Sequence, residues 1–135
     1  MLVAGFPAGS WGTNCYVVAA GPGEPALIID PGQASIDGVH EILRENRLAP
    51  AAVLLTHGHI DHVFGVDLYE EEARTNGWAP PRVVAHEAIT DRFERYRLTA
   101  GYNAVINQRQ FKAPGLRWPT DYRHPDTTYR DSLEI

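Results

Sequence analysis

The chain has 135 residues, enough for one domain with a buried core, and 44% of them are hydrophobic, as in ordinary globular proteins. Its net charge of −5 argues against binding nucleic acid or an anionic membrane through bulk electrostatics. Cys15 is the only cysteine, which excludes an internal disulfide. The sequence also shows neither a signal peptide nor an apolar run long enough to cross a bilayer, so we expect a cytoplasmic protein.

The first third of the chain is predicted to begin with strands separated by turns. Strands rich in apolar and β-branched residues are expected at residues 2–6, 14–20 and 26–29. Pro7 should end the first strand, because proline cannot donate to a sheet ladder. Asp30-Pro31-Gly32 should end the third.

A helix should follow, with Ser35 as its N-cap and an end near Asn46, before Pro50. Its apolar stripe at helical spacing consists of Ile36, Val39, Ile42 and Leu43. The next apolar run, residues 52–55, leads directly into a loop rich in histidine. This strand–helix–strand order predicts an α/β fold with the loop at the carboxyl end of a strand, where open sheets place their ligands.

Beyond the loop the sequence predicts a helix over residues 66–75, a strand over 82–85 and a helix from His86 to about Tyr96. Residues 99–131 give no assignable pattern, and residues 132–135 resemble the start of a strand. Acidic residues are in excess over 1–91 and basic residues over 92–135. We expect the basic part to pack over the acidic body; the alternative is an anion-binding wall for a charged substrate.

The loop itself concentrates metal-binding side chains, because three histidines and one aspartate lie between positions 57 and 62. Imidazole and carboxylate are common donors to zinc, iron and manganese. Gly58 lets the backbone turn so that His57 and His59 can aim to one side, and Asp61 and His62 follow one turn later. The spacing therefore predicts two ligand pairs. A polar loop with histidines by chance is the alternative.

This loop resembles the signature of the metallo-β-lactamase superfamily. The segments that resemble its glyoxalase II-like hydrolases are Asn14-Cys15-Tyr16, Ile29-Asp30-Pro31-Gly32 and Leu55-Thr56-His57-Gly58-His59. The resemblance covers about residues 1–90 and implies half of an αββα sandwich, a mixed sheet with flanking helices. It also implies a hydrolase in which metal-activated water attacks an ester- or thioester-like small-molecule substrate.

The resemblance assigns roles by position. His57 and His59 match ligands of a first metal, and Asp61 and His62 match ligands of a second, with Asp61 also the catalytic residue that orients the attacking water. Asp30 matches an acidic residue that supports the site without binding metal, and we count Gly58 as a second supporting residue. The cofactor so implied is Zn²⁺, two ions in the complete family site, with iron or manganese as alternatives.

The family needs further ligands from a C-terminal half. After the loop this sequence has only His86, expected at a helix start, and His124, expected in a surface loop. We therefore expect 1–135 to be a partial domain, with a core half over 1–91, and to be a truncated product, an expressed fragment or one part of a split enzyme. Weak metal retention and weak or absent catalysis should follow.

The Arg/Tyr-rich segment 92–135 departs from the glyoxalase II-like pattern. A solvated helix with a packed loop is one interpretation of residues 92–111, and a wall of the substrate pocket is the other. For the whole chain, the alternative to an enzyme is a catalytically inactive metal-binding or interaction half-domain. Such a half-domain would self-associate or pair with a complementary chain, because it exposes an apolar face. A nuclease of the same superfamily is a weaker alternative.

Overall fold

The structure is a computed structural model that describes residues 1–110, 112, 114–115 and 118–134. Within these residues the strands form a single six-stranded sheet in sequential order. The strands are β1 (Leu2–Ala8), β2 (Thr13–Ala19), β3 (Pro25–Ile29), β4 (Ala49–Leu55), β5 (Arg82–His86) and β6 (Thr127–Tyr129). The first three pair antiparallel, and β3 to β6 pair parallel, so the sheet is mixed.

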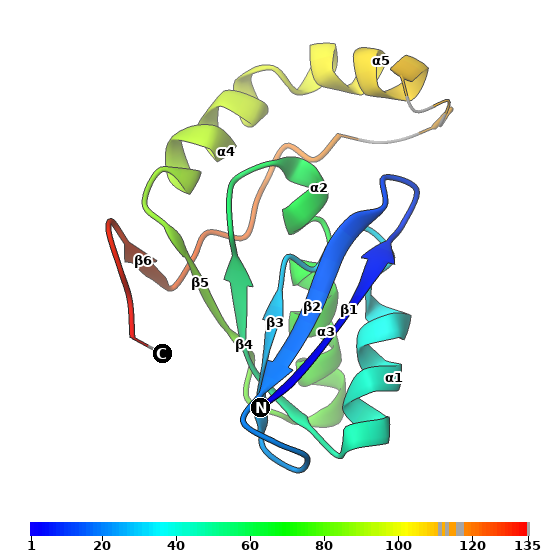
Figure 1. Cartoon of the computed structure of the whole chain (residues 1–135). Coiled ribbons are helices and arrows are strands. Elements are labelled where there is room, and N and C mark those ends of the chain that lie inside the picture. The colour runs from blue at the N-terminus through cyan, green and yellow to red at the C-terminus, as the bar shows by residue number, and fades with distance from the viewer. Residues whose placement is uncertain (111, 113, 116–117, 135) are drawn as a thin grey trace.

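The helices divide between one face of the sheet and its carboxyl edge (Figure 1). They are α1 (Ile36–Asn46), α2 (Ile60–Val63), α3 (Val66–Asn76), α4 (Ile89–Leu98) and α5 (Ala100–Gln110). Helices α1 and α3 cover one face, whereas α4 and α5 arch over the end of the sheet at which β4 leads into α2 (Figure 1). The last two helices therefore stand above the histidine loop.

The core lies between the sheet and helices α1 and α3. Val17, Ile28, Val53 and Val83 pair in register across four neighbouring strands, and each is fully buried. Strand side chains alternate between faces, so this row defines the covered face. The helices contribute Val39, Leu43, Val66 and Tyr69 to the same cluster.

The opposite face of the sheet carries apolar side chains that the described residues cover only in part. Val3 is 55% exposed and Tyr16 40% exposed, and the partly exposed Leu27, Ile29 and Leu54 lie on the same face. We call these five residues the open sheet face. A sheet with one covered and one open apolar face is half of a sandwich, as the sequence predicted. No helix among the described residues is long and apolar enough to cross a membrane.

The predicted strand–helix–strand unit is confirmed, because β3 and β4 are parallel neighbours joined through α1. The prediction that Pro7 ends the first strand is wrong. The strand continues to Ala8, because β1 is an edge strand and tolerates a residue without an N–H. Ser35 is the N-cap of α1, yet its side chain makes no capping bond; its Oγ lies 3.2 Å from the Tyr69 hydroxyl oxygen.

The observed elements differ most from the predicted ones toward the C-terminus. His86 ends β5 instead of opening a helix, and α4 begins at Ile89. Helix α5 and strand β6 fall in the part for which no element was predicted. Residues 132–134 are not a strand, and Ile135 lies outside the described residues.

The basic C-terminal segment packs on the acidic body, as expected. The Arg123 side chain donates to Glu70 of α3 at 2.5 Å, and Arg130 donates to Glu87 at 2.7 Å. These ion pairs join residues far apart in sequence and fasten the segment that carries β6 beside β5.

Candidate metal centre

The candidate site lies where the carboxyl ends of two parallel strands meet. Asp30 directly follows β3, and the histidine loop directly follows β4. The Asp30 N–H donates to Leu54 O at 2.9 Å, which extends the β3–β4 ladder into the site. Asp30 has a backbone φ of 50°, a left-handed conformation that aspartate adopts more readily than most residues.

Glycines allow the turn after β3 to approach the loop closely. A Cβ on Gly32 would lie 2.6 Å from Asp61 O, and one on Gly65 would lie 2.6 Å from Pro31 O. The Gly65 N–H donates to that same Pro31 oxygen at 2.8 Å. Since backbone atoms cannot yield as a flexible side chain does, both positions require glycine.

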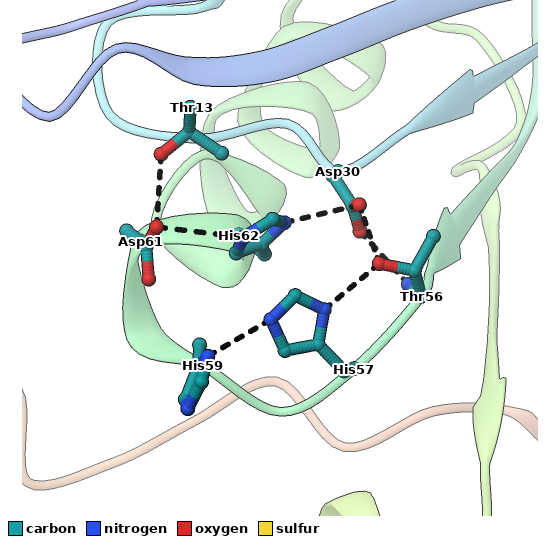
Figure 2. Close-up of polar contacts among 7 residues, drawn as sticks. All are labelled: Thr13, Asp30, Thr56, His57, His59, Asp61 and His62. Atoms are coloured by element: carbon teal, nitrogen blue, oxygen red, sulfur yellow. Dashed lines mark hydrogen bonds and ion pairs between the residues drawn. The ribbon is translucent and has the colours of Figure 1, made fainter.

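The Asp30 carboxylate is the organising group of the site. It is 5% exposed. Its Oδ1 accepts the Thr56 N–H at 2.8 Å, and its Oδ2 accepts the Thr56 hydroxyl at 2.6 Å. The same Oδ2 lies 3.0 Å from His62 Nδ1 (Figure 2). One buried carboxylate therefore contacts both ends of the loop.

A relay through Thr56 fixes the tautomer of His57. Thr56 Oγ1 lies 3.0 Å from His57 Nδ1 (Figure 2). The Thr56 hydroxyl has one hydrogen, and it goes to the Asp30 carboxylate, which can only accept. His57 Nδ1 must therefore carry a proton and donate to Thr56. In the neutral ring, Nε2 then holds the lone pair, which is the state that a metal ligand needs.

The two predicted ligand pairs come together in space. His57 Nε2 lies 2.9 Å from His59 Nδ1, and because His57 Nε2 holds a lone pair, His59 Nδ1 donates this hydrogen bond. His62 Nε2 lies 3.4 Å from Asp61 Oδ2. The Thr13 hydroxyl donates to that oxygen at 3.1 Å. Figure 2 shows the four side chains converging from one short loop.

The residues present fit a metal ion by their chemistry. Among the described residues, ligand atoms of Asp30, His57 and His62 lie within 4.8 Å of one another. His62 Nδ1 is buried and makes no well-directed hydrogen bond there, despite its closeness to Asp30. Clustered imidazoles and carboxylates of this kind suit zinc, iron or manganese.

Electrostatics keep the first histidine neutral. Partial burial lowers the pKa of His57 below its ordinary value, and the neighbouring His62 and His59 lower it further, against the opposing charges of Asp30 and Asp61. A lowered pKa favours the neutral imidazole near pH 7, which is the form that binds metal.

Gly58 supports the loop in a way that its sequence position did not reveal. A Cβ there would lie 2.9 Å from Cβ and Cγ of Arg92 and 3.1 Å from Ile89, both on α4. The glycine therefore permits close packing of the loop under α4, and its φ is not in the left-handed region.

The two histidines that follow the loop in sequence stand apart from it. His86 Nε2 lies 2.8 Å from Arg130 O, and His86 Nδ1 accepts the Ala88 N–H at 3.1 Å. His124 is exposed and lies edge-on to Phe93, with ring centres 5.5 Å apart. Sequence reasoning missed Thr13 and Thr56 as members of the site, although Thr56 directly precedes the histidines.

A cavity of about 450 Å³ opens beside the loop. Its described lining comes from the loop, from the β1–β2 turn, from α4 and α5, and from the segment after α5, namely Trp11, His59, Asp61, Tyr96, Asn103, Asn107, Gln110 and Trp118. Of the two interpretations of residues 92–111, this placement favours the pocket wall.

Fold and site together define an α/β protein with a candidate metal centre at the carboxyl edge of a half-sandwich. The family description "Metallo-beta-lactamase superfamily" matches residues 8–131. The chain belongs to this superfamily.

Relatives match shorter stretches. An uncharacterized protein of Mycobacterium tuberculosis is 59% identical over 64 residues, which is 47% of this chain and 29% of that protein. A hydroxyacylglutathione hydrolase of Edwardsiella ictaluri is 53% identical over 45 residues, 33% of this chain and 17% of the enzyme. An atrochrysone carboxyl ACP thioesterase of Aspergillus chevalieri is 41% identical over 70 residues, 48% of this chain and 22% of the enzyme.

Solved structures share the fold. The BLEG-1 B3 metallo-beta-lactamase aligns with a TM-score of 0.62 at 24% identity, covering 99% of this chain and 56% of that one. TTHA1623 in a di-iron-bound form aligns with a TM-score of 0.63 at 23% identity, covering 98% and 56%. The chain thus spans about half the length of these structures and much less of the relatives above.

Proposed function

We propose that this chain supplies the first half of a metal-dependent hydrolase site that cleaves an ester- or thioester-like bond in a small molecule. The observation that carries the proposal is the convergence of the two ligand pairs, in which the buried Asp30 carboxylate contacts His62 directly and reaches His57 through Thr56. His57 and His59 would hold a first ion, and Asp61 and His62 a second. Zinc is the first choice, with iron or manganese as alternatives.

In this proposal Asp30 is a positioning residue and not a ligand. Its distance to the imidazoles alone would allow ligation. However, Oδ1 and Oδ2 both accept hydrogen bonds from Thr56, and the carboxylate is buried. A carboxylate so engaged orients the imidazoles, as outer residues of metal sites commonly do.

Asp61 has a second role in the proposed reaction. The described residues contact its carboxylate at Oδ2, through Thr13 and His62. We assign to Oδ1 the task of orienting and accepting a proton from the attacking water. A bound metal would supply Lewis acidity and lower the pKa of that water.

Two relatives support the thioester alternative by their names. One is a hydroxyacylglutathione hydrolase and another an ACP thioesterase. The open sheet face and the limited coverage of relatives support a site that is completed elsewhere. A zinc site commonly takes four ligands, and this chain offers one pair per ion.

Metal analysis tests the proposal most directly. We expect purified protein, supplied with Zn²⁺, to retain metal weakly through gel filtration, and His59→Ala to abolish that retention. His124→Ala, at an exposed histidine outside the loop, is the matched control and should not change it. Tight binding of two ions by this chain as a monomer would contradict the incomplete site, and equal metal content in His59→Ala would contradict the loop as the site.

Hydrolysis is tested with a thioester whose released thiol is measured. We expect low turnover that EDTA removes, that Zn²⁺ restores and that Asp61→Asn abolishes. Turnover insensitive to EDTA would refute a metal-dependent reaction.

A catalytically inactive half-domain that self-associates or pairs with a complementary chain is the second candidate, favoured by the open sheet face. Sedimentation of the chain and of the double variant Val3→Lys/Tyr16→Lys distinguishes the interaction half-domain from the enzyme. Oligomers that dissociate in the double variant, together with no turnover on any thioester, would favour the interaction module.

A further inference from the structure

One wall of the cavity beside the loop is made of side-chain carboxamides. Asn103, Asn107 and Gln110 of α5 all line it. They are spaced four and three residues apart, which places them on one face of the helix. Their Cα atoms extend over about 10 Å at the ordinary rise of an α-helix. The carboxamides therefore form a row along a cavity that His59 and Asp61 of the histidine loop also line.

Each of the first two carboxamides is anchored by its nitrogen. Asn103 Nδ2 donates to Thr99 Oγ1 at 2.8 Å, and Asn107 Nδ2 donates to Asn103 O at 2.8 Å. A carboxamide has two N–H donors and an oxygen with two lone pairs, so one bond to the helix does not exhaust it. The anchoring reduces the rotamer freedom that a ligand would otherwise have to freeze.

Aromatic side chains form a second part of the described wall. Trp11, Tyr96 and Trp118 line the cavity, and the ring centres of Tyr96 and Trp118 lie 5.6 Å apart. No lysine or arginine is among the described lining residues, and Asp61 is the one carboxylate there. Arg92 is the nearby cation, and its guanidinium lies 5.9 Å from the Tyr96 ring centre, outside the described lining.

These features select against an anionic ligand. Among the described lining residues, a carboxylate in this cavity would meet Asp61 and no cation. A neutral chain of methylene groups and amides would instead pack on the aromatic rings and exchange hydrogen bonds with the carboxamides. The helix face supplies both donors and acceptors for such a chain.

We propose that the carboxamide row of α5 is the specificity surface of the site and binds a neutral, amide-bearing thiol portion of the substrate. The inference rests on the proposed thioester hydrolysis for the identity of the ligand. A thiol portion bearing several carboxylates is disfavoured at this wall. Asn103 and Asn107 are the residues that discriminate between the two.

Binding of unreactive thioethers tests this without any turnover. The probes are S-butyl-N-acetylcysteamine, its isostere with an acetate ester in place of the acetamide, and S-butylglutathione. Quenching of tryptophan fluorescence reports binding because Trp11 and Trp118 line the cavity. Trp78 lies elsewhere, so the measurements use a Trp78→Phe background. We expect the acetamide probe to bind about five- to tenfold more tightly than either other probe, the gain of one hydrogen bond.

Leucine substitutions then locate the preference. Asn103→Leu and Asn107→Leu keep the side-chain size and favour the helix, so the fold should persist. Each should reduce the preference for the acetamide over the ester by about three- to tenfold, whereas Gln108→Leu, on the same helix but outside the described lining, should retain it. The proposal is overturned if S-butylglutathione binds as tightly as the acetamide probe, or if both Asn variants keep the full preference.

The two proposals can fail separately. Preferential thioether binding without hydrolysis of any thioester would refute the proposed reaction and leave the specificity surface standing. Hydrolysis without an amide preference in binding would do the reverse.

Discussion

Replacing Asp30 by asparagine should remove the negative charge that orients Thr56 and His62 of the histidine loop. Asparagine has nearly the same shape and also tolerates the left-handed backbone that Asp30 adopts, so the change isolates the carboxylate. Either the Thr56 donors or His62 Nδ1 will then face an NH₂ group where an anion had been. Because the group is 5% exposed, water cannot replace the lost bonds.

The expected magnitude follows from those contacts. A hydrogen bond to a charged group contributes about 1.5–3 kcal/mol net, and an unmatched buried donor costs about 1–3 kcal/mol. Part of the acceptor capacity survives in asparagine, so we expect Asp30→Asn to lower the free energy of unfolding by about 2–4 kcal/mol. Metal affinity should fall by roughly ten- to a hundredfold, as when outer residues of metal sites are changed.

Two measurements separate positioning from stability. Urea denaturation gives the stability loss, and competition with a chromophoric chelator, well below the unfolding transition, gives the metal affinity. Asp37→Asn, at an exposed aspartate in the first turn of α1, is the control; it should leave metal affinity unchanged and cost only about 0.3–1 kcal/mol of stability, through the helix dipole. Thr56→Val should reproduce the affinity loss, and Thr56→Ser should restore most of it, because serine keeps the relaying hydroxyl. Unchanged metal affinity in Asp30→Asn would refute the orienting role.

Further predictions concern packing, reactivity and pH. Gly65→Ala should lower the unfolding free energy by about 1–3 kcal/mol, because its Cβ meets backbone oxygens, whereas Gly101→Ala, with open space in α5, should raise it by about 0.5–1 kcal/mol; urea denaturation checks both signs. Burial, aided by a nearby carboxylate, raises the pKa of the Cys15 thiol to about 12, so Ellman's reagent at pH 8 should label it only after unfolding, and rapid native labelling would contradict this. Burial raises the pKa of Asp126, but the Val83 N–H and Arg123 outweigh it and leave that pKa below its ordinary value. The folded state therefore gains stability from Asp126 above the ordinary pKa and loses it as pH falls through the lowered value, so Asp126→Asn should weaken the protein at pH 7 and make little difference in strong acid; an equal deficit at both would count against the assignment.

Much of the fold follows from local patterns in the first ninety residues. Apolar runs of strand length and one amphipathic helix specify β3, α1 and β4. Gly77, with a φ of 69°, closes α3 after Asn76, one residue beyond the predicted end. Helix α5 was not predicted, because it buries no residue fully and so lacks the apolar stripe by which helices are recognised in a sequence. Its function as a pocket wall explains that composition: polar carboxamides face the cavity, and Tyr102 and Val105 remain exposed.

The candidate ligands were identifiable because they are contiguous in sequence, whereas the groups that orient them are not. Thr13 lies 48 positions from Asp61, and Asp30 lies 26 positions from Thr56. A short motif identifies which side chains can bind a metal. It does not identify which distant hydroxyl or carboxylate selects a tautomer, since that depends on how strands align.

Strand alignment is the step on which the chemistry depends. The parallel register sets Ile29 beside Leu54, and the Asp30 N–H continues the ladder to Leu54 O, which places the Asp30 carboxylate within reach of the Thr56 N–H. Because side chains alternate between faces, a slip of one residue would turn Asp30 or Thr56 to the other side of the sheet and break the relay to His57. The fully buried Ile28 and Val53 resist such a slip, since it would move one of them out of the core. The apolar packing of two strands thus helps to set the tautomer of a histidine at their end.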